Sequence, residues 1–249
     1  MLRAPGTSTV DHFRTIVRKM SKPTKHSVLL SGSQQARPER LSRGLSALLA
    51  EVRACTACAA VLPREPRPVL RAHQDARVLI VGQAPGVRVH ETGIPWNDRS
   101  GDRLREWLAI DRDRFYDERR FAIIPVGYCY PGRGVSGDLP PRAECAPLWL
   151  ARLLAELPRI ELTILIGQYA QRLYLQNRRK ASLTETVKAF REYSPRFIPL
   201  PHPSPRNQSW LQRNPWFASE VVPALRRACR SVGVYQSAPL LFTTDTRRK

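Results

Sequence analysis

Four unbroken apolar runs constrain the fold of this chain more than any other feature of its sequence. Strands without polar alternation, separated by helical patterns, are typical of a parallel sheet covered on both faces. The sequence therefore predicts an α/β fold of three layers, α/β/α, with a central four-stranded, mainly parallel sheet. We expect strands at 77–81, 121–126, 162–166 and 196–200, and helices at 41–52, from about 100, from about 141, at 167–174 and at 217–232.

The second predicted strand and the helix that follows it each have a distinctive feature. Pro125 is a weak point in the second strand, because proline cannot donate to a sheet ladder. In the helix that starts near Pro141, we expect Leu148 and Leu153 to face the core together with Cys145.

The charge of the chain limits its partners. Its 249 residues carry a formal net charge of +20, which favours polyanions such as nucleic acid over a merely solvated basic surface. No apolar run is long enough for a membrane span, and the first residues lack the apolar core of a secretory signal. We therefore expect a cytoplasmic monomer that does not bind membranes and that associates with the nucleoid if the source is bacterial.

The two ends of the chain differ in composition from its centre. Residues 1–40 are basic and rich in small and polar residues, which predicts a disordered tail. A transit peptide, a DNA-contacting arm and an over-extended start with Met20 as the true beginning are all compatible with this composition. We place one domain at 41–232 and a second tail at 233–249.

Glycine- and proline-rich turns follow the predicted strands. Loops at the carboxyl ends of parallel strands form the ligand crevice of open α/β sheets. We therefore expect the segments 82–86, 129–138 and 202–207 to converge with Gly167 on one site.

Four cysteines form a second pattern. Cys55 and Cys58 make a Cys-x2-Cys pair, and fifteen residues separate Cys129 from Cys145. Four thiolates suit zinc or an iron–sulfur cluster, and the wide second pair favours the cluster. Four unrelated buried thiols are the alternative. The fifth, Cys229, lies in a helical pattern and is expected to pack there, because an odd count argues against a disulfide framework.

In this order, the motifs resemble those of the uracil-DNA glycosylase superfamily, above all its family 4 and family 5 types with a [4Fe-4S] cluster. The resemblance covers about residues 45–230. It rests on the cysteine pattern, on Gly82-Gln83-Ala84-Pro85-Gly86, where family 4 reads Gly-Glu-Ala-Pro-Gly, on Gly93-Ile94-Pro95-Trp96, and on His202-Pro203-Ser204-Pro205.

The resemblance implies a base-excision repair enzyme that hydrolyses the N-glycosidic bond of uracil or a related deaminated base in DNA. A non-catalytic DNA-binding member of the same superfamily is the alternative. The expected metal ligands are Cys55, Cys58, Cys129 and Cys145, which would hold a [4Fe-4S] cluster, with zinc as the second choice.

The resemblance also assigns roles at the site. His202 is expected to donate a hydrogen bond to a carbonyl oxygen of the departing base. Asp98 is expected to orient water or to balance the sugar cation, although an N-cap for the following helix is an equally simple role. Gln83 can orient water but cannot act as a base. The expected base-binding residues are Gly82, Ala84, Trp96, Asn97 and Ser136.

DNA contacts are expected after the histidine, where relatives insert a segment into the duplex. Arg206 and Leu211 are the candidates for this insertion, and Ser204 is expected to hold a phosphate, with Asn207 nearby. The chain departs from its relatives at 129–138, which contains no asparagine to read the uracil edge. Ser136 and Asp138 are candidates to replace it. The preferred lesion therefore stays open, with hypoxanthine and xanthine as alternatives and loss of activity as a further outcome.

Overall fold

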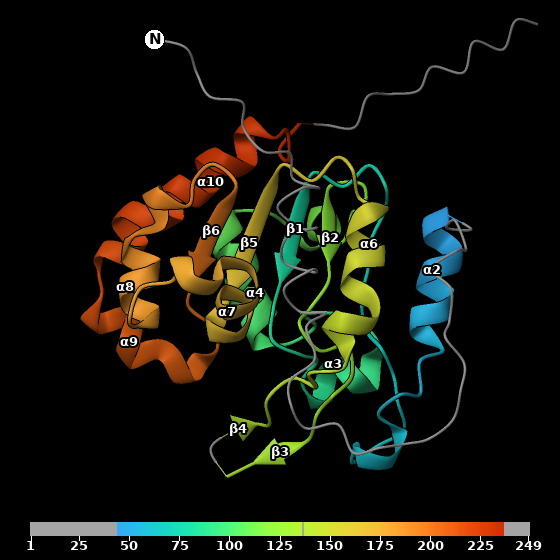
Figure 1. Ribbon diagram of the computed structural model, residues 1–249. Helices are drawn as coiled ribbons and strands as arrows, with labels where there is room; N and C mark the ends of the chain where they lie inside the picture. The colour runs from blue at the N-terminus through green and yellow to red at the C-terminus, as the bar shows by residue number, and fades with distance from the viewer. Residues whose placement is uncertain (1–43, 136, 237–249) are drawn as a thin grey trace, which may run out of the picture.

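The computed structural model describes residues 44–135 and 137–236 (Figure 1). The predicted N-terminal tail, Ser136 and residues 237–249 lie outside the described residues.

The central sheet confirms the predicted fold class. Four parallel strands lie in the order β2 (Phe121–Ile123), β1 (Val78–Val81), β5 (Leu162–Ile166) and β6 (Phe197–Leu200). The second strand is shorter than predicted. It ends at Ile123, although Ile124 donates to the Ile80 carbonyl and Val126 to the Gly82 carbonyl, so hydrogen bonding to the β1 segment continues past Pro125.

Helices cover both faces of the sheet, as Figure 1 shows. Side chains alternate across β1, so that Leu79 and Val81 pack on one side while Val78 and Ile80 pack on the other. The first side is covered by α2 (Gly44–Arg53), the π-helical turn η2 (Ala146–Leu150), α6 (Ala151–Ala155) and α7 (Gly167–Leu175), which is followed by η3 (Gln176–Arg178). The second side is covered by α4 (Arg99–Leu108), α5 (Arg112–Phe115), α8 (Leu183–Lys188), η4 (Phe190–Glu192), η6 (Phe217–Val221) and α10 (Val222–Ser231).

The helix expected from about Pro141 differs from the prediction. It begins with the π-helical turn η2, and Leu148 is 47% exposed, whereas Leu153 and Leu154 are buried in the core. The expectation that Leu148 faces the core was wrong, because the wider π-helical turn changes the angular spacing of the side chains.

The domain also continues beyond residue 232. Val234 is buried on the α4 and α10 side, and the Tyr235 hydroxyl donates to the Leu108 carbonyl at 2.6 Å. Packing therefore extends to the last described residues. Within 44–135 and 137–236, no helix has the length and apolar character that a bilayer span requires.

The carboxyl ends of the strands carry the loops that build the site. The antiparallel hairpin of β3 (Arg133–Gly134) and β4 (Gly137–Asp138) and the helix α3 (Val87–Thr92) lie together beyond this edge of the sheet in Figure 1. The remaining short elements are η1 (Ala59–Val61), η5 (Pro205–Asn207) and α9 (Gln208–Arg213).

Candidate active site

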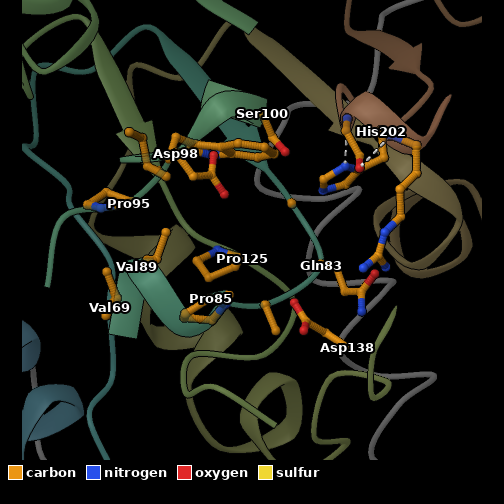
Figure 2. A pocket seen from close by; sticks show the side chains of 17 residues that line it. Val69, Gln83, Pro85, Val89, Pro95, Asp98, Ser100, Pro125, Asp138 and His202 are labelled. Atoms are coloured by element: carbon orange, nitrogen blue, oxygen red, sulfur yellow. Dashed lines mark hydrogen bonds between the residues drawn. The ribbon is translucent and has the colours of Figure 1, made fainter. Parts of the chain in front are cut away.

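One cavity of about 270 Å³ lies at the carboxyl ends of the strands (Figure 2). Its size is close to the lower end of small-ligand pockets, about 300 Å³. The β1–α3 turn, the loop before α4, the β3–β4 hairpin and the loop after β6 all contribute to its wall. It brings together these residues singled out in the sequence: Gly82, Gln83, Ala84, Trp96, Asp98, Asp138, His202, Ser204 and Arg206.

His202 lines the cavity as a partly buried imidazole. The backbone N–H of Ser204 donates to its Nδ1 at 3.2 Å, and Asn207 Nδ2 donates to its carbonyl oxygen at 2.8 Å. Because Nδ1 accepts, the neutral ring carries its proton on Nε2. Burial lowers the pKa of His202, although the charge of Asp98 acts in the opposite direction. The ring is therefore a neutral Nε2–H donor at pH 7.

Asp98 lies both at the start of α4 and in the wall of the cavity. Its Oδ1 accepts a hydrogen bond from the Gly101 N–H at 2.8 Å, so it is the N-cap of α4. The same carboxylate lines the cavity and interacts electrostatically with His202. The capping hydrogen bond fixes the position of the Asp98 carboxylate in the cavity wall.

Trp96 is held in an unusual backbone conformation beside His202. Its φ is +58°, and its indole lies 5.7 Å from the His202 ring, measured between centroids. A Cβ on Gly101 would lie only 1.7 Å from the Trp96 carbonyl oxygen, so only glycine fits there. A Cβ on Gly82 would lie 2.8 Å from Trp96 Cζ2. The two glycines thus define the position of the indole.

Gln83 faces the hairpin side of the cavity. Its Nε2 donates to the Leu139 carbonyl at 3.1 Å, directly after β4. Figure 2 shows Gln83 and Asp138 together, across the cavity from Asp98 and Ser100.

Several predicted site residues lie elsewhere. Asn97 does not line the cavity, and its Oδ1 accepts from Arg112 Nη2 at 2.8 Å. Leu211 does not line the cavity; it is half-buried and packs against the core on the α10 side. Asn207 supports the His202 backbone and does not line the cavity. Ser136 lies outside the described residues.

Sequence reasoning missed two polar residues of the site. Ser100, in the first turn of α4, is 8% exposed and lines the cavity. Arg103 donates to the Ser204 carbonyl at 3.3 Å and to Gln208 Oε1 at 3.1 Å, so α4 anchors the loop that carries His202. In the sequence Arg103 is one of many helix-surface arginines, and no local signal marks it.

Two of the four predicted metal ligands, Cys129 and Cys145, lie within electrostatic range of the other two, Cys55 and Cys58. Cys55 follows α2, Cys58 precedes η1, Cys129 follows β2 and Cys145 precedes η2. Burial raises the pKa of Cys129 and of Cys145 to about 11, and both thiols also feel the charges of Cys55 and Cys58.

This donor set fits a thiolate-bound metal centre, because it is all sulfur and largely buried. However, no three His, Cys, Asp or Glu side chains within 44–135 and 137–236 are arranged as a metal site.

The fold and the site define an α/β enzyme domain with its reaction centre at the carboxyl ends of parallel strands. A family model described as the uracil DNA glycosylase superfamily matches residues 70–226, and the chain belongs to this superfamily. The chain is also similar to a type-4 uracil-DNA glycosylase of Thermotoga maritima, with 28% identity over 137 residues, which cover 54% of this chain and 67% of that protein. These findings confirm the resemblance seen in the motifs.

Proposed function

We propose that the protein is a DNA glycosylase of base-excision repair that hydrolyses the N-glycosidic bond of uracil or a related deaminated base. The observation that carries this function is the neutral Nε2–H donor of His202 in the cavity at the strand ends. The similarity to a type-4 uracil-DNA glycosylase supports it. The net charge of +20 suits a DNA substrate.

Departure of the base requires a group that stabilises negative charge. When the bond between sugar C1′ and the base nitrogen breaks, its electron pair passes to the base, and charge grows on the adjacent carbonyl oxygen. His202 Nε2–H donates to this oxygen, and Trp96 stacks against the extruded ring.

Addition of water completes the reaction. The sugar is left with positive charge at C1′, which the Asp98 carboxylate stabilises across the cavity. Asp98 also takes up the proton that the water loses when it adds to C1′. Gln83 orients the water without accepting its proton, because an amide is not a base at neutral pH.

We further propose that Cys55, Cys58, Cys129 and Cys145 hold a [4Fe-4S] cluster, with zinc as the alternative. When bound, such a cluster supplies a structural cross-link between the segment after α2 and the loops around η2. Ser204 is proposed to hold a DNA phosphate. The monomeric state and the cytoplasmic location remain predictions from the sequence.

A base-release assay tests the function. Labelled single- and double-stranded DNA carrying uracil, hypoxanthine or xanthine is incubated with the protein, and abasic product is measured. We expect product with at least one lesion, and its loss in His202→Ala. A folded, metal-loaded protein that binds these DNAs and yields no abasic product would contradict the proposal and favour a binding role.

A further inference from the structure

Asp138 and Arg206 form a part of the cavity wall that the proposed chemistry does not use. Asp138 ends β4 and Arg206 lies in η5, and both side chains line the cavity. A Cβ on Gly137 would lie 2.8 Å from Arg206 Nη1, so the guanidinium lies against the hairpin. A Cβ on Gly86 would lie 3.5 Å from Asp138 Oδ2, so the carboxylate lies over the β1–α3 turn.

The two charges interact. Burial raises the pKa of Asp138, and the charges of Arg206 and Arg133 oppose this shift. An acid in this position is therefore partly desolvated and partly balanced by a cation. Opposite charges that only stabilise the fold need no cavity, whereas both of these side chains line one together with the predicted base-binding residues Gly82, Ala84 and Trp96.

The other polar side chains of the cavity have different tasks. The Gln83 amide nitrogen donates to the Leu139 carbonyl. Asp98 caps α4 and lies on the opposite side, with His202. The Ser204 hydroxyl accepts from the Arg206 N–H at 3.3 Å. Asp138 with Arg206 is therefore the charged pair that faces the base from the hairpin side.

The pair has a defined chemical complement. A carboxylate only accepts hydrogen bonds and a guanidinium only donates them. When both face the same base, they match a ring edge that carries an N–H donor beside a carbonyl acceptor. Uracil and hypoxanthine have this edge. Cytosine and adenine present the reverse order, a ring-nitrogen acceptor beside an amino donor, so their ring nitrogen would face the carboxylate.

We propose that Asp138 and Arg206 together read the N–H and carbonyl edge of the extruded base and so select deaminated bases over cytosine and adenine. This inference rests on the proposed glycosylase function. Asp138 accepts from the ring N–H, and Arg206 donates to the carbonyl oxygen. The arginine charge offsets that of the carboxylate, so the base carbonyl does not face an unbalanced anion.

The test separates recognition from cleavage. Single-stranded DNA carries one 2′-fluoro-2′-deoxyuridine or one 2′-fluoro-2′-deoxycytidine, because the fluorine disfavours the cationic sugar and the base stays attached. Binding is measured by fluorescence anisotropy at pH 8. We expect the wild-type protein to bind the uridine DNA more tightly by about tenfold or more, the range of a good paired contact to a base edge.

Variants identify the residues responsible. Asp138→Leu removes the acceptor for the ring N–H of uracil, so it should weaken binding of the uridine DNA. The preference for uridine over cytidine DNA should then fall to within about twofold. Asp138→Asn should shrink it mainly by improving cytidine binding, because an amide can rotate to donate. Arg206→Leu should lose affinity for the uridine DNA selectively. The matched control Arg213→Leu, at the exposed end of α9, should weaken both DNAs equally.

A wild-type protein without preference, or an Asp138→Leu variant that keeps it, would overturn the inference. If Asp138→Leu does not fold, as judged by its melting curve, Asp138→Asn and Arg206→Leu decide by the same measurement. Release of base from unmodified deoxyuridine DNA is measured in parallel. A binding preference for uridine DNA without base release would refute the proposed enzyme but support the recognition pair. Base release without a binding preference would support the enzyme and refute the recognition pair.

Discussion

A single methyl group at Gly82 tests how the cavity is built. A Cβ there would lie 2.8 Å from Trp96 Cζ2, closer than carbon atoms approach without displacement. The indole has little freedom to move away. The Tyr116 hydroxyl donates a hydrogen bond to the Pro95 carbonyl at 2.8 Å, and Gly101 packs closely against the Trp96 carbonyl. Gly82→Ala must therefore displace the ring that stands beside His202.

We expect this substitution to lower the free energy of unfolding by about 1–3 kcal/mol, as other overpacked sites do. Base release should fall about 100-fold, because a shift of about 1 Å near reacting atoms has an effect of this size. Denaturant unfolding and single-turnover base release measure the two quantities.

Gly86→Ala is the matched control in the same turn. Its Cβ would meet Asp138 Oδ2 at 3.5 Å, an ordinary contact, and its φ of −77° suits any residue. It should therefore leave stability nearly unchanged. If Gly82→Ala has wild-type stability and rate, the close packing of Trp96 on Gly82 is refuted.

Three further predictions concern the imidazole, the carboxylate and the thiols. His202→Gln should slow base release by about 100- to 1000-fold, the effect of losing one oxyanion donor. Because burial lowers the pKa of His202 below 6.5, wild-type release should stay level from pH 8 to 6.5 and fall only at lower pH; a fall centred above pH 6.5 would contradict this. Below pH 6.5 the histidine binds a proton in the unfolded chain more readily than in the folded one, so the free energy of unfolding should decrease there. This decrease should be smaller in His202→Gln. Asp98→Ala should lose both rate and about 1 kcal/mol of stability, whereas Asp98→Asn should lose rate alone; equal rates in Asp98→Asn and wild type would exclude a role for the charge. Cys145→Ala should lower iron and sulfide content and melting temperature, while Cys229→Ala, a buried thiol on the other side of the sheet, should keep its iron; unchanged iron in Cys145→Ala would refute its role as a ligand.

The fold class could be predicted because its signals are local. A buried parallel strand needs a short unbroken apolar run, and such runs stand out in any sequence. The gathering of strand-end loops also follows from topology alone, which is why the 82–86 turn and the loop of His202 could be assigned to one site before their positions were known. Trp96 and Asp98 were assigned to the same site through the family resemblance. The ends of the elements could not be predicted as closely, since β2 ends at Ile123 and a π-helical turn starts the helix that follows.

The sequence by itself thus determined the layers, the order of the chemistry along the chain and the cysteine pattern. Only the tertiary structure decided which side chains meet. Arg103 anchors the loop of His202 from α4, Leu211 packs partly against the core, and Arg206 in η5 lies against the hairpin and interacts electrostatically with Asp138. These contacts join segments far apart in the chain. They depend on loop paths and rotamers that are selected by packing, and packing is a property of the whole domain rather than of any segment.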